Sequence, residues 1–149
     1  MFKTSVGIRV ISFAVLITLL LASFPTAVAA AKDNNRGLEA KWAKLIDIYN
    51  RQSITHNSVP RWVAQWMSDH RKAPARKKAE LQKNLELSNA AWTPVPSIVM
   101  RHNGFDAQGN VVDKAAARQS VKDLSKALQR YKASIKNLKA FLRQYGMEG

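Results

Sequence analysis

The sequence contains no cysteine and few acidic residues. Its 149 residues include 24 Lys and Arg against 10 Asp and Glu, giving a formal net charge of +14, with only six Gly and five Pro. The absence of thiols excludes disulfide frameworks, Cys-ligated zinc, cysteine nucleophiles and lipid attachment through a cysteine. The length fits one domain and excludes an enzyme with separate cofactor and substrate domains. A hydrophobic fraction of 46% excludes a wholly disordered chain.

A long stretch near the N-terminus lacks charge altogether. Lys3 and Arg9 precede an uncharged, mostly aliphatic run at 10–24, and small residues follow it. This order is typical of a secretory signal peptide at 1–29, with cleavage at Ala29 or Ala30. The alternative is an uncleaved membrane anchor at about 10–31, because these 22 uncharged residues can cross a hydrocarbon layer of about 30 Å.

Both interpretations place the rest of the chain outside the cytosol. It is expected in a periplasm or outside the cell, or else anchored with its C-terminal domain outside the cytosol. Without Lys3 and Arg9, 22 basic side chains remain against 10 acidic ones, a net charge of +12. We divide this part into a flexible start at 30–37 and a basic helical domain at 38–149. A chain of about 120 residues buries roughly two-thirds of its unfolded surface and can fold without disulfides.

Helical spacing of the apolar residues predicts an all-α protein, a small bundle of three to four helices. The first helix is expected to begin near Leu38 and to fade at 51–55. Asn57 or Ser58 is then expected to cap a second, short helix that has Pro60 in its first turn.

A third helix is expected from about 74 to 91, rich in Ala, Lys, Glu, Leu and Gln. The segment 93–96, Thr-Pro-Val-Pro, is expected to stop any helix. The run at 98–100 favours a strand, and turn residues follow it. We therefore expect either a short β-hairpin near 98–112 or an ordered loop with one turn.

The last helix has the clearest pattern, from about 113 to 145 with Asp113 as its cap. Its apolar residues alternate spacings of three and four, forming a heptad seam of Val121, Leu124, Leu128, Tyr131, Ile135, Leu138, Leu142 and Tyr145. In a parallel dimer, Lys132 and Lys139 beside this seam would lack acidic partners. Packing within one chain is therefore favoured, with an oligomer through the 121–145 seam as the alternative.

The basic residues are clustered rather than spread evenly. One cluster lies within thirteen residues and comprises Arg71, Lys72, Arg76, Lys77, Lys78 and Lys83. A second lies on the outward side of the last helix and comprises Lys132, Lys136, Lys139 and Arg143. Such density attracts phosphates and carboxylates, and the attraction weakens with salt. These ten residues are the candidate anion- or partner-binding residues, although a merely solvated surface would look the same.

Aromatic and histidine residues give weaker functional signals. Trp62 and Trp66 are one helical turn apart, which favours a core stripe, with an interfacial anchor beside the basic run as the alternative. His56, His70 and His102 have no spacing that places two imidazoles on one helical face, so no metal site or other cofactor is predicted. Common nucleophile-elbow, phosphate-loop and zinc-protease motifs are missing, so no catalytic residue is predicted.

These features predict an exported, basic, helical binding or accessory protein. Its expected partners are anionic lipid, polysaccharide or an acidic protein surface, with nucleic acid a weaker expectation and membrane contact open. A membrane-anchored structural subunit of an envelope assembly, such as a secretion or transfer machine, is the first alternative. A small exported enzyme with an unrecognised site is the second.

Overall fold

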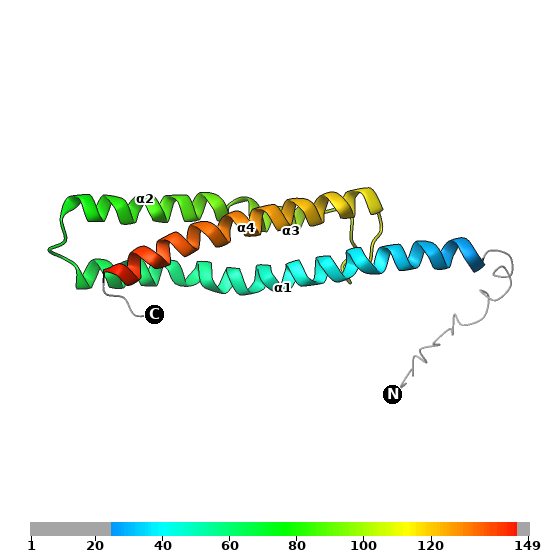
Figure 1. Cartoon of the computed structure of the whole chain (residues 1–149), viewed down its shortest axis with the longest axis horizontal. Helices are drawn as coiled ribbons and strands as arrows, with labels where there is room; N and C mark the ends of the chain where they lie inside the picture. Colours follow the sequence, from blue (N-terminus) through cyan, green and yellow to red (C-terminus); the bar gives the residue numbers. More distant parts are fainter. Residues whose placement is uncertain (1–24, 146–149) are drawn as a thin grey trace, which may run out of the picture.

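The computed structural model describes residues 25–145. Within that range the chain forms four helices and no sheet (Figure 1). They are α1 (Pro25–Asp69), α2 (Ala75–Trp92), α3 (Pro94–Arg101) and α4 (Lys114–Gln144). The predicted all-α bundle is confirmed. None of the helices between residues 25 and 145 combines the length and apolar character needed to span a membrane.

The N-terminal predictions meet only the beginning of this range. Most of the predicted signal peptide at 1–29, and of the alternative anchor at 10–31, lies outside the described residues. The cleavage positions Ala29 and Ala30 fall within α1. Residues 30–37, predicted as a flexible start, also belong to α1. Alanine has the highest helix propensity, and the alanines at 27 and 29–31 favour continuation of the helix.

α1 is one continuous helix where two were expected. The hydroxyls of Thr55 and Ser58 explain why no break occurs, since they donate to the carbonyls of Arg51 and Ile54 one turn earlier instead of capping a new helix. Pro60 is exposed and removes only one helical N–H. Continuous burial on the other face, with Val59 and Trp66 each 1% exposed, offsets the cost of that proline.

The connection from α2 to α4 also differs from expectation. α2 ends at Trp92 as predicted, but Pro94 occupies the first turn of α3, where a missing N–H is tolerated. The run at 98–100 is therefore helical. The predicted hairpin is reduced to a single antiparallel bridge between Phe105 and Val111.

α4 is the element on which the others pack. Its N-cap is confirmed, since the Asp113 carboxylate accepts the N–H of Ala116 at 2.9 Å. Figure 1 shows α1 running parallel to α4 and α2 running antiparallel to it. Both pack mainly on α4 and only lightly on each other. The seam is thus covered within one chain, and its fully buried members are Leu124, Leu128, Tyr131, Ile135, Leu138 and Leu142. A dimer through this seam would have to displace α1 and α2.

The loop before α4 is held against both α1 and α4. The Glu39 carboxylate on α1 accepts the backbone N–H of Val111 at 3.1 Å. The carbonyl of buried Gly104 accepts the N–H groups of Val112 and Asp113 at 3.0 and 3.4 Å. A Cβ atom at Gly104 would lie 2.2 Å from the backbone nitrogen of Ala117, so only glycine allows this approach to α4.

Gly104→Ala is therefore expected to destabilise the protein by about 3 kcal/mol, because two backbone segments must move apart. The matched control is Gly37→Ala, where a Cβ meets no atom within 4 Å. Gly37 lies in α1, so alanine there should stabilise the helix by up to about 1 kcal/mol. Urea denaturation of both variants measures the difference. Equal effects of the two substitutions would contradict the close approach at Gly104.

A candidate anion-binding surface at one end of the bundle

The two predicted basic clusters lie at the same end of the bundle. Antiparallel packing places the beginning of α2 beside the end of α4, where Lys77 Nζ contacts the Tyr145 hydroxyl and lies 4.2 Å from the centre of its ring. The C-terminal part of α1 joins them, since the rings of Trp66 and Phe141 are 5.6 Å apart. We call residues 61–83 and 132–145 the basic end.

The basic end carries most of the excess charge. Its two segments contain eleven Lys and Arg, opposed only by Asp69 and Glu80. The other residues from 35 to 131 contain ten basic against six acidic side chains. Each of the two predicted clusters extends over no more than about 20 Å of chain, at a helical rise of 1.5 Å per residue. The structure therefore unites two groups that are about 60 residues apart in the sequence.

Three of the ten predicted residues have structural contacts. Lys77 Nζ also approaches Glu80 at 3.3 Å, and the Tyr145 hydroxyl bond is the main reason that the pKa of Lys77 is raised. Lys78 Nζ donates to the Arg71 carbonyl at 2.8 Å, which closes the turn between α1 and α2. Lys139 Nζ lies 4.9 Å from the centre of the Trp62 ring, a cation–π contact.

The other seven residues are free to meet a ligand. They are exposed and form no ion pair with another described residue: Arg71, Lys72, Arg76, Lys83, Lys132, Lys136 and Arg143. Sequence reasoning missed an eighth, Arg61, which is exposed on the same part of α1. Arg61 precedes the first cluster by ten residues in the sequence, and no local pattern indicates that it lies beside the clusters.

The tryptophans are used mainly in the core. Trp66 is 1% exposed, and Trp42 and Trp92 are also buried. Trp62 is half-buried beneath Lys139. With Trp66 inside the bundle, the two rings do not form an exposed pair at the basic end, which removes the interfacial-anchor interpretation for that pair.

The histidines lie in three separate places. His102 packs edge-on against Trp42, and His70 Nδ1 is 3.0 Å from the Trp66 carbonyl. His56 stacks on Trp92, with ring centres 4.9 Å apart. Among the described residues, no group of three or more His, Asp and Glu side chains could hold a metal ion.

Comparison with known proteins identifies no relative. No protein-family model, curated protein or solved structure matches the chain. The functional argument therefore depends on the geometry and charge of this molecule alone.

The centre of the bundle contains buried polar groups that do not belong to the basic end. The Tyr131 ring lies 5.7 Å from that of His56 and 4.7 Å from that of Trp92. Burial raises the pKa of Tyr131 to about 12, an effect that the nearby Ser88 hydroxyl opposes. Burial also lowers the pKa of His56 below its ordinary value of 6.5. Both groups are therefore held in their neutral forms.

The His56 shift predicts a loss of stability in acid. Since the unfolded chain binds a proton at His56 near pH 6.5 and the folded chain resists it, the free energy of unfolding should fall as pH drops through and below 6.5. His56→Phe keeps a ring against Trp92 and should lack this part of the pH dependence. Urea denaturation at about pH 7.5 and 5.5 tests it. His70 and His102 are common to both proteins, so an unchanged pH dependence in His56→Phe would contradict the assignment.

Proposed function

We propose that this protein is an exported binding or accessory protein whose basic end captures anionic material of the cell envelope or an acidic partner. The observation that supports this most directly is the meeting of two basic clusters at one end of a bundle whose packing does not require them. Seven of the ten predicted cationic residues are exposed there without ion pairs to described residues. A fold needs no such concentration, because exposed like charges repel each other and destabilise the compact state.

The arrangement suits a ligand that carries several negative charges. The cationic side chains extend over about 20 Å of helix, by the rise of 1.5 Å per residue, instead of converging on one buried point. Each remains solvated, so attraction is long-ranged, additive and sensitive to salt. A surface of anionic lipid headgroups or a polymer of repeated phosphates or carboxylates presents charge over a similar length. The α-helical core acts as a rigid support that keeps the charges together.

Charge neutralisation at the two ends of the bundle tests this proposal. The basic-end variant combines Arg71→Gln, Lys72→Gln, Arg76→Gln and Lys136→Gln. The control variant removes the same charge from the other half of α4, through Arg118→Gln, Lys122→Gln, Lys126→Gln and Arg130→Gln. All eight side chains are exposed, so both variants should fold.

Each protein is used in the form that remains after cleavage at Ala29 or Ala30, which we call the exported form. It is mixed with vesicles of anionic or neutral phospholipid, with an anionic polysaccharide and with an acidic polypeptide. In about 50 mM salt, where the screening length exceeds 10 Å, the wild type should bind at least one anionic probe and no neutral vesicle. The basic-end variant should lose roughly a hundredfold or more in affinity, since each basic side chain near an anionic surface contributes about 1 kcal/mol. Equal losses in both variants, or no binding to any anionic probe, would overturn the proposal.

The length of α1 favours a second candidate, a membrane-anchored subunit of an envelope assembly. α1 continues at its N-terminal end beyond the loop that joins α3 to α4 (Figure 1). Its 45 residues span about 66 Å, so an uncleaved apolar segment before Pro25 would sit far from the basic end. The basic end would then meet an acidic partner protein and not the membrane that holds the anchor.

The intact mass of the native protein, measured after cell fractionation, separates these candidates. A soluble exported protein whose mass begins near Ala30 is expected for the first candidate. A full-length mass in the membrane fraction, together with a larger complex after mild detergent extraction, is expected for the second. A full-length monomer in detergent would contradict both.

A further inference from the structure

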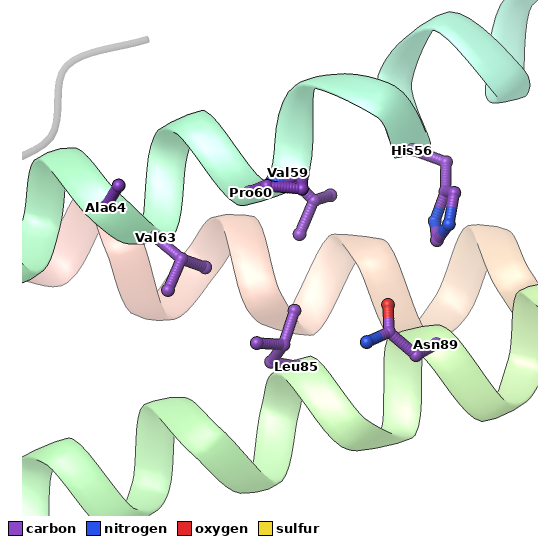
Figure 2. Close-up of a pocket in the computed structure, with 7 residues that line it drawn as sticks. All are labelled: His56, Val59, Pro60, Val63, Ala64, Leu85 and Asn89. Atoms are coloured by element: carbon purple, nitrogen blue, oxygen red, sulfur yellow. The ribbon is translucent and has the colours of Figure 1, made fainter.

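A groove between α1 and α2 begins at the basic end, to which Val63 and Ala64 belong, and extends from there to His56 and Asn89. α1 and α2 both pack on α4 but only lightly on one another, and a space of about 340 Å³ lies between them. Figure 2 shows the seven residues that line it, five from α1 and two from α2: His56, Val59, Pro60, Val63, Ala64, Leu85 and Asn89. A volume of this size is at the lower end of the range for small-molecule sites.

One end of the groove is apolar. Val59 and Val63 on α1 face Leu85 on α2 across it, with α4 behind (Figure 2). Val59 is 1% exposed, whereas Val63 and Leu85 are half-buried. Their partly exposed surface would gain from contact with a short hydrocarbon chain.

The other end is polar, and several of its groups lack hydrogen bonds. Because Pro60 has no N–H, the His56 carbonyl lacks the donor that a helix normally provides four residues later. The Nδ1 atom of His56 is buried and has no partner. The Asn89 amide stands on the opposite wall, on α2 (Figure 2). Asn89 is exposed, and its side chain forms no hydrogen bond with another described residue, which leaves the amide available to a ligand.

Two more unpaired groups lie in the protein beneath His56. The hydroxyls of Ser88 and Tyr131 are both buried and close enough that Ser88 lowers the pKa of Tyr131, although they form no hydrogen bond of good geometry, and neither residue lines the groove. Buried polar groups are nearly always paired, and leaving one unpaired costs roughly 1–3 kcal/mol. Three of the six unpaired buried side-chain atoms in the described chain belong to His56, Ser88 and Tyr131. Of these three residues only His56 lines the groove, so a ligand's polar group there could pair with His56 and not with the two hydroxyls behind it.

We propose that the groove binds a small amphipathic molecule with an uncharged head group that both donates and accepts hydrogen bonds, such as a primary amide or an alcohol. The head lies between His56 and Asn89, and a short apolar chain lies along Val59, Val63 and Leu85. A charged head is disfavoured, because no lining residue carries an opposite charge to offset its desolvation. This site borders the basic end but differs from it in chemistry, because none of the lining residues is Lys or Arg.

The test uses four probes that share an eight-carbon chain and differ in the head: octanamide, 1-octanol, octanoate and octylammonium. Each is titrated at neutral pH into the exported form of the protein labelled with nitrogen-15, and backbone amide shifts are followed by NMR. Octanamide and 1-octanol should shift the amides at 56–64 and 85–89, and the two charged probes should bind there at least about tenfold more weakly. Octanoate shifts confined to residues 71–83 and 132–145 would report anion binding by the basic clusters and not binding in the groove.

Two variants and a control locate the site. Leu85→Trp should fill the groove and weaken octanamide binding by more than about tenfold. The control Leu87→Trp adds the same side chain on α2 at a position that is 54% exposed, and it should bind octanamide normally. Asn89→Leu keeps the groove open and removes one hydrogen-bonding partner, so octanamide affinity should fall roughly three- to tenfold.

Three results would overturn the inference. They are no shift at 56–64 and 85–89 with octanamide, equal binding of charged and uncharged heads in the groove, and octanamide affinity unchanged by Asn89→Leu. The last variant decides the case even if Leu85→Trp fails to fold. Each of these outcomes leaves vesicle and polyanion binding by the basic end unaffected, so failure here is separable from failure of that proposal.

Discussion

Burial of the apolar face of α4 along its whole length determines the rest of the structure. The helix has 31 residues, or about 46 Å, and ten of them are buried within the chain. Covering such a length requires partners of comparable extent. α1 supplies one partner only because it continues through Pro60. α2 and α3 together supply the other, and their 26 residues would span about 39 Å if placed end to end. Only Thr93 lies between the end of α2 and the beginning of α3, so the proline-rich segment interrupts this cover of α4 only briefly.

The same packing produces the basic end. Because α2 is antiparallel to α4 and α1 is parallel to it, the end of α1, the beginning of α2 and the end of α4 must meet (Figure 1). The contacts of Lys77 with Tyr145 and of Lys139 with Trp62 fix some of this charge against aromatic rings. The exposed cations around them have no such structural role, and their mutual repulsion works against folding. An anionic partner, as we propose, would offset this repulsion.

The light packing between α1 and α2 is a further consequence of the central role of α4. Each helix is positioned by α4 and not by the other, so the space between them is filled incompletely. The unpaired Nδ1 atom of His56 belongs to a residue that lines this space.

The sequence predicted the long-range organisation of this fold better than its breaks. The seam of α4, its Asp113 cap and the extent of α2 follow from periodicity and capping chemistry, both of which are local. The break near residues 51–60 was wrong because Pro60 was weighed as a local helix signal, whereas burial of Val59 and Trp66 on α4 is a tertiary effect. The prediction of a strand at 98–100 was wrong in the same way, because a local preference was outweighed by packing. These residues belong to α3, which begins at Pro94. Both basic clusters were visible as sequence runs, but their meeting and the addition of Arg61 depend on helix direction, which no local pattern gives.

The most direct test of this account is the distance between the two basic clusters in solution. The chain has no cysteine, so nitroxide spin labels can be placed at single introduced cysteines without background labelling. One doubly labelled protein carries Lys72→Cys with Arg143→Cys, and the other carries Lys72→Cys with Arg118→Cys. Positions 118 and 143 are about 38 Å apart along α4. Pulsed electron spin resonance should give a much shorter and narrower distance for the 72–143 pair than for the 72–118 pair. Similar distances for the two pairs, or the reverse order, would contradict the antiparallel packing of α2 on α4 and the basic end with it.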